Sequence, residues 1–171
     1  MKNNYKDEIL AGLAETSNDL FKTLDLFPQD QFNKIPFENS WTAAQVADHI
    51  FKSETGIPAV LKGKSKQALR EPDEKVEQIK SIFLNYDLKM KSPDSVLPSN
   101  EKQDKEDLSA RLKSNREEIV RLAGSINLED VFYDFEFPGI GALTGTEWLT
   151  FAICHTKRHT HQMKNIADKL K

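Results

Sequence analysis

The sequence predicts an all-α protein that folds as a four-helix bundle. Four segments repeat apolar residues at the three- and four-residue spacing of an amphipathic helix. Hydroxyl residues suited to capping stand where two of these helices are expected to begin, and proline and glycine gather between them. A chain of 171 residues, with 38% hydrophobic and 30% charged residues, fits one domain over residues 1–171 with a substantial core.

The first two helices are predicted over residues 4–27 and from Ser40 to about Gly56. The apolar stripe of the first helix consists of Ile9, Leu13, Leu20, Leu24 and Phe27. Pro28 ends this helix, because proline disfavours a helical residue before it. Ser40 is the expected N-cap of the second helix, since its hydroxyl can accept from free N–H groups of the first turn.

A long connection separates the second helix from the third. Residues 57–100 are interrupted by prolines and can hold a short helix over residues 73–84. The third helix of the bundle is predicted over residues 104–125. Glu117 and Arg121 are expected to form an ion pair on its exposed face, because they are four residues apart.

A second long connection leads to the last helix. Residues 127–145 alternate phenylalanine with acidic residues, and we expect an extended, partly buried connector rather than a sheet, because no strand partner is apparent. The last helix is predicted from Thr144 or Thr146 to about Leu170. Long connections at two places permit parallel as well as antiparallel neighbours in the bundle.

Three of the four histidines fall in the last helix. His155 and His159 lie within or beside its apolar stripe and one turn apart, so both imidazoles can reach a single metal ion. Two core or boundary histidines satisfied by hydrogen bonds, or two simply exposed histidines, are the alternative interpretation. His161 lies on roughly the opposite side of the helix and is expected to face solvent.

The fourth histidine, His49, lies at the margin of the apolar arc of the second helix. His49 and His155 each lie about two turns after the start of their helix, and each start is capped and carries a tryptophan. If those starts lie at one end of the bundle, the three imidazoles lie at the same height. Three neutral imidazoles leave at least one coordination position open, as in catalytic sites. Imidazole suits several metals, of which zinc or nickel are the leading choices; an ordinary surface histidine is the alternative at position 49.

Two segments resemble the DinB-like superfamily, which includes metal-dependent hydrolases and bacterial thiol S-transferases. Residues 40–49, SWTAAQVADH, resemble the family's Trp-Ser/Thr helix start that leads to one ligand histidine. Residues 155–162, HTKRHTHQ, resemble its His-x-x-x-His-x-x-Gln segment with the other two ligands. The resemblance spans nearly the whole chain. It implies an up-down-down-up bundle, a metal site at His49, His155 and His159, and often a homodimer, but it implies a reaction much less firmly.

Other side chains near these segments are weaker candidates. Gln162 lies one turn beyond His159 and can form a hydrogen bond that fixes an imidazole tautomer or a bound water; an interhelical amide contact is the alternative. Asp48 and Glu147 are candidate acids or bases, although capping or surface roles are expected for both. Cys154 lies off the histidine stripe and is expected to be a small packing residue.

Two tryptophans and three lysines complete the candidates. Trp41 and Trp148 are expected to pack in the core at the helix starts, with an aromatic wall over the metal site as the alternative. Lys62, Lys64 and Lys66 are expected in a solvated loop, with attraction of an anionic substrate or cofactor as the alternative.

The predicted function is that of a metal-dependent enzyme with a small-molecule substrate. Its open position would bind water or a low-molecular-weight thiol, for hydrolysis or S-transfer, and no general base is identifiable. A non-catalytic metal-binding stress or interaction protein and a bundle without metal are the alternatives.

Partners and compartment follow from composition. A net charge of −3 argues against nucleic acid as the main partner. No apolar run has the length of a membrane span, so no membrane association is expected. The N-terminus lacks a signal-peptide pattern, and the single cysteine cannot form an internal disulfide, which together predict a reducing cytoplasm.

Overall fold

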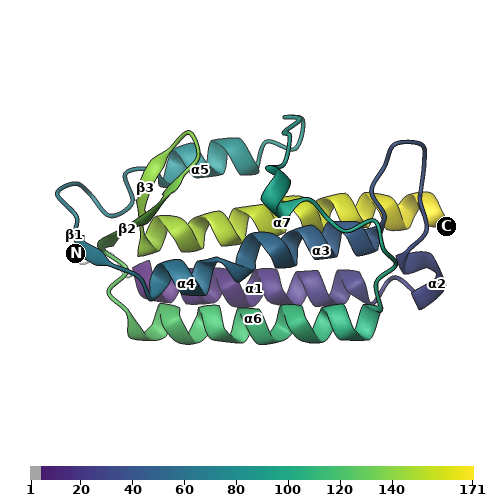
Figure 1. The fold of residues 1–171 in the computed structure, drawn as a ribbon, viewed down its shortest axis with the longest axis horizontal. Helices are drawn as coiled ribbons and strands as arrows, with labels where there is room; N and C mark the ends of the chain where they lie inside the picture. The colour runs from purple at the N-terminus through teal and green to yellow at the C-terminus, as the bar shows by residue number, and fades with distance from the viewer. Residues whose placement is uncertain (1–4) are drawn as a thin grey trace.

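The computed structural model describes residues 5–171 and contains a bundle of four long helical segments (Figure 1). These segments are α1 (Tyr5–Leu24), α3 (Ala43–Thr55) continued by α4 (Ile57–Leu61), α6 (Lys105–Ser125) and α7 (Gly145–Leu170). The predicted four-helix bundle is therefore confirmed. None of the helices in the described part of the chain is both long and apolar enough to cross a membrane.

The helices run up, down, down and up along the bundle. In Figure 1, α1 and α7 run from left to right, whereas α3 and α6 run from right to left. Helix α7 packs against both α1 and α3, and α6 completes the ring by packing against the same two helices. Since α3 and α7 are antiparallel neighbours, the supposition that their capped starts lie at one end of the bundle is wrong.

Capping boxes begin the two helices that carry the histidines. Thr42, not Ser40, is the N-cap of α3: its hydroxyl accepts from the backbone N–H of Gln45 at 3.1 Å, and the Gln45 side chain accepts from the N–H of Thr42 at 3.0 Å. Ser40 lacks a glutamine or glutamate three residues later, which is why the reciprocal pair forms at Thr42. Thr144 and Glu147 form the same motif at the start of α7, as predicted for the first of the two candidate starts.

A three-stranded antiparallel sheet lies at one end of the bundle, so the prediction of an extended connector without a sheet is wrong. The strands are β1 (Ser65–Gln67), β2 (Asp130–Phe137) and β3 (Gly141–Thr144). The segment 127–145 folds back on itself through a turn with positive φ at Gly139 and Gly141, and β1 pairs with the free edge of β2. The missing partner strand thus comes from the preceding long connection, about 60 residues away in the chain.

The long connection after α4 also lies along the bundle. Its helix α5 (Val76–Phe83) packs on α7 with Ile79 and Phe83 buried, which confirms the short helix predicted there. The following residues 84–100, here called the strap, include the 3₁₀ turn η1 (Asp94–Val96) and contact α3. A further short helix, α2 (Gln29–Phe32), follows α1.

A buried polar layer separates two hydrophobic clusters in the bundle core. Each of the four helical segments contributes one residue to it: Thr16, Glu54, Arg116 and Thr156. The Arg116 guanidinium donates to the Glu54 carboxylate at 2.6 Å and to the Thr156 hydroxyl. The layer was not predicted, because a helical wheel shows that a polar residue interrupts a stripe but not that its partners lie on other helices.

The surface ion pair predicted on α6 forms with a different partner. Arg121 pairs with Glu118, three residues away, through two contacts of 2.8 Å, rather than with Glu117. Both spacings lie on one helix face, and Glu118 also accepts from Lys62, so its carboxylate lies between two cations.

Candidate metal centre

Helices α3 and α7 bring three buried histidines together. His49 comes from α3, and His155 and His159 come from successive turns of α7; their exposed fractions are 3, 5 and 8%. One ring nitrogen of each lies within 4.8 Å of the other two. The predicted convergence of these imidazoles is therefore confirmed, although by a different route: α3 begins beside the C-terminal half of the long α7, so antiparallel helices place His49 next to His155.

Hydrogen bonds at Nδ1 set the tautomers of two of the rings. His49 Nδ1 lies 2.8 Å from the backbone carbonyl oxygen of Val96, and His159 Nδ1 lies 2.8 Å from Oε1 of Gln162. Because these oxygens only accept, each Nδ1 carries the proton and each Nε2 keeps a free lone pair. Gln162 thus forms a hydrogen bond with the imidazole of His159, one of the two roles considered for it from the sequence.

His155 is held by packing instead. Its ring contacts Phe83 and Phe151, with ring centroids 6.0 and 5.2 Å away, and its Nδ1 has no hydrogen-bond partner within residues 5–171. Its Nε2 lies 3.1 Å from Nε2 of His49. Two lone pairs at this distance repel each other unless a proton or a cation lies between them.

The spacing of these two nitrogens fits a bound cation. A tetrahedral zinc ion with bonds of 2.0–2.1 Å separates two nitrogen ligands by about 3.4 Å. The observed 3.1 Å differs from this by a few tenths of an ångström, which small ring rotations can supply. The donor set of three imidazoles also suits borderline-soft divalent metals.

Burial keeps the three imidazoles in the form that can bind a metal. Loss of solvent around the rings lowers the pKa of His49, lowers that of His155 well below its usual value, and lowers that of His159 to about 3. Repulsion from neighbouring histidines acts in the same direction on His155 and His159. All three rings are therefore neutral near pH 7, so a cation does not have to displace the second proton of an imidazolium ion.

An open cleft of about 660 Å³ leads to one side of the histidine cluster. His159 and Gln162 line it from α7, Trp41 lines it from the segment just before α3, and the strap forms much of its remaining wall. Trp41 is half-buried with its ring 5.2 Å from that of His49, so it forms an aromatic wall of the site. Trp148 is buried in the core among phenylalanine rings, as predicted for both tryptophans.

The strap is tied to α3 beside the site by three contacts to its backbone. Besides the His49 contact to Val96, Lys52 Nζ donates to the carbonyl of Leu97 at 2.9 Å, and the N–H of Ser99 donates to Asp48 at 2.8 Å. Backbone groups carry no signature in the sequence, so these partners were not predictable. Asp48 is buried rather than at the surface, because its carboxylate holds the strap.

The remaining candidates lie away from the cluster or serve the fold. Glu147 does cap α7, but it is fully buried rather than at the surface and also pairs with Arg70 at 2.6 Å. Cys154 is buried as predicted, and burial raises the pKa of its thiol. His161 is exposed, as predicted, and stacks on Tyr86.

The three lysines near β1 do not contribute to the cleft. Lys62, Lys64 and Lys66 are exposed, as predicted, and none of them lines it. Lys62 pairs with Glu118, and Lys66 lies over the ring of Tyr133.

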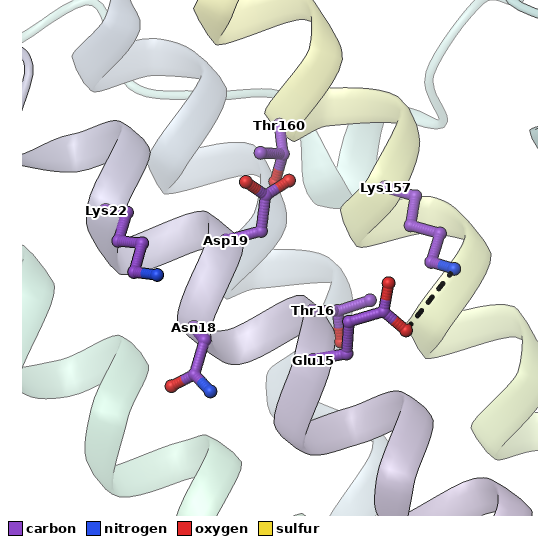
Figure 2. Close-up of a pocket in the computed structure, with 7 residues that line it drawn as sticks. All are labelled: Glu15, Thr16, Asn18, Asp19, Lys22, Lys157 and Thr160. Carbon is purple, nitrogen blue, oxygen red and sulfur yellow. Dashed lines mark ion pairs between the residues drawn. The ribbon is translucent and has the colours of Figure 1, made fainter.

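A second groove, of about 430 Å³, lies between α1 and α7. Figure 2 shows Glu15, Asp19 and Lys22 on α1 together with Lys157 and Thr160 on α7, and the ion pair between Lys157 and Glu15 at 4.0 Å crosses it. None of the three clustered histidines lines this groove. The chemistry that the imidazoles can perform therefore belongs to the other cleft.

Comparisons with known proteins agree with this architecture. A protein described as uncharacterized protein YuaE from Bacillus subtilis (strain 168) is 28% identical over 157 residues, which cover 91% of this chain and 93% of that protein. The structure of YfiT from Bacillus subtilis, described as a probable metal-dependent hydrolase with an unusual four-helix bundle topology, matches with a TM-score of 0.66. The two sequences are 17% identical, and the match covers 99% of this chain and 90% of the YfiT chain. At this identity the likeness supports the fold alone. The sequence model of the DinB superfamily matches residues 13–163, and the chain belongs to this superfamily.

Proposed function

We propose that this protein is a metal-dependent enzyme in which His49, His155 and His159 hold a divalent ion, with zinc or nickel as the expected metal. The observation that carries the proposal is the convergence of three buried imidazoles, two of which have Nδ1 committed to an acceptor so that Nε2 is available for a cation. Hydrogen-bonded histidines of this kind are typical of metal sites.

The residues around this centre would have different roles. Three imidazoles leave room for a further ligand, and a divalent ion there would lower the pKa of a water or thiol bound beside them. Gln162 and the Val96 carbonyl keep two rings in the tautomer that coordinates. Phe83 and Phe151 keep water from the third ring, and the cleft at His159 admits the substrate.

Two reactions are consistent with this arrangement. YfiT, whose fold this chain shares, is described as a probable metal-dependent hydrolase, and hydrolysis is the first reaction that we propose for this chain. A thiol reaction is equally consistent with the lining of the cleft, which among the described residues contains no aspartate or glutamate that could act as a base. A thiol loses its proton on binding a cation and needs no protein base. We therefore propose a hydrolase or a thiol S-transferase.

Metal content tests the ligand assignment. Protein purified without a polyhistidine tag is expected to contain one zinc or nickel ion per chain by elemental analysis. His49→Ala, His155→Ala and His159→Ala should lose it, and the exposed His161→Ala should keep it. Circular dichroism checks that each variant is folded, and His155→Gln repeats the test with less change in core volume. Unchanged metal in the folded variants would contradict the assignment.

Turnover tests the enzyme class. Metal-loaded protein should hydrolyse members of an ester and amide panel, or join low-molecular-weight thiols to electrophiles. The activity should be lost on chelation and restored by zinc or nickel. Stoichiometric metal without turnover in either panel would contradict an enzyme and leave a metal-binding protein. The homodimer that the family resemblance implies stays a prediction, which light scattering on the purified protein can check.

A further inference from the structure

The cleft beside the histidines carries charge of one sign. Lys89 and Lys91 of the strap and Arg158 of α7 line it, and no acidic side chain does so among the described residues. Asp87 and Asp94 belong to the same strap but are not part of the lining. A concave surface lined by cations concentrates anions from solution.

The lysine charges are not neutralised by the protein. Within residues 5–171, neither Lys89 nor Lys91 has an ion-pair or hydrogen-bond partner, and both are exposed. Arg158 donates to the backbone carbonyls of Asn85, at 2.7 Å, and Leu88, and it faces no carboxylate there. Arg158 therefore holds the strap in place while adding its charge to the cleft.

The same cleft has apolar walls. The strap contributes Leu88, Met90 and Leu97, with exposed fractions of 41, 39 and 41%, and Trp41 and Phe37 line the cleft from the segment leading into α3. Large apolar side chains gathered at an open cleft indicate a surface that a ligand covers. The volume of about 660 Å³ lies in the range of small-molecule sites.

We propose that this cleft binds an organic anion with an apolar body, which lies against Trp41 and the strap while its acid group meets Lys89 and Lys91. His159 and Gln162 line the same cleft, so the bound molecule lies beside the histidine cluster. This deepens the proposed function, on which it rests, by naming the chemical class of the substrate. The anion-binding step itself is measurable without metal.

A pair of fluorescent probes isolates the role of charge. Anilinonaphthalene sulfonate and phenylnaphthylamine share one apolar body, but only the first carries a negative group. The double variant Lys89→Glu/Lys91→Glu is compared with Lys64→Glu/Lys113→Glu, which changes the net charge equally at exposed positions outside the cleft. Titrations use folded, metal-free and metal-loaded protein at low ionic strength.

We expect the cleft variant to bind the sulfonate probe about tenfold or more weakly than the wild type, and the control variant to change its affinity less than about twofold. The neutral probe should change less than about twofold in either variant, and Met90→Ala should weaken both probes by removing part of the apolar wall. Equal loss of the sulfonate probe in the two double variants would overturn the proposal, and so would unchanged binding in the cleft variant.

The two proposals fail separately in this design. Selective anion binding by metal-free protein, together with histidine variants that leave the metal content unchanged, would reject the metal site and keep the anion site. Metal loss in the histidine variants, together with a sulfonate affinity that is unchanged in Lys89→Glu/Lys91→Glu, would reject the anion site and keep the metal site.

Discussion

Each of the three clustered imidazoles reaches its orientation by a different means. His49 is held by a backbone carbonyl, which no substitution removes, and His155 is held by two phenylalanine rings. His159 depends on a side chain, Gln162. The orientation of one imidazole can therefore be altered without changing any of the three histidines.

Gln162→Ala is expected to weaken metal binding by about tenfold or more, because His159 loses the acceptor that keeps its proton on Nδ1. Gln162→Glu should retain or raise the affinity, since a carboxylate is a stronger acceptor at the same position. Competition with a chelator measures both. Gln78→Ala, which removes an exposed glutamine side chain of α5 outside the cleft, is the control. Equal affinities for Gln162→Ala and the control would contradict a role for the amide.

At the scale of elements, the start of α3 decides where His49 lies. The Thr42 capping box ends the preceding connector and fixes the start of α3 at Ala43. His49 follows six residues later, within the first two turns of the helix. The antiparallel α7 then faces it with the turns that carry His155 and His159. The strap contacts both α3 and α7 beside the histidines. A connecting segment therefore contributes to the site together with the two helices.

Thr42→Ala should lower the free energy of unfolding by about 1 kcal/mol, because the N–H of Gln45 loses its acceptor. Ser40→Ala, two residues earlier, should change it by less than about 0.5 kcal/mol, since Ser40 caps no helix. Urea unfolding of both variants measures the difference. A larger loss for Ser40→Ala than for Thr42→Ala would contradict the observed cap.

At the scale of the whole molecule, the polar layer joins all four helical segments. Arg116 reaches α1 through Ser17, α3 through Glu54 and α7 through Thr156, and the two hydrophobic clusters lie on either side of it. A slip of one helix along its neighbours would leave a buried charge without its partner, which is costly in a core. The layer therefore favours one register of the bundle.

Arg116→Met is expected to destabilise the protein by about 3–5 kcal/mol, because the Glu54 carboxylate then stays buried without a counter-charge. The double variant Arg116→Met/Glu54→Leu should recover much of this loss, since both charges are gone. Urea unfolding of the single and double variants, with Glu54→Leu alone, completes the cycle. Additive losses in the double variant would show that the pair does not interact.

Local patterns in the sequence determined the helices of the bundle and the candidate ligands. Apolar stripes and caps depend on residues within a few turns of one another, so α1, α6 and α7 could be predicted to within a few residues. His155 and His159 lie on one face of a single helix, so their proximity also needed no tertiary information.

Only the tertiary structure decided what depends on residues far apart in the chain. The antiparallel packing of α3 on α7 brings His49 to the pair, the edge of β2 receives β1 from a distant segment, and Arg116 meets partners on three other helices. The strap supplies backbone carbonyls and cationic side chains to the site, and backbone groups are the same in every sequence. Long-range pairing and main-chain contacts follow from how whole elements pack, which no local pattern encodes.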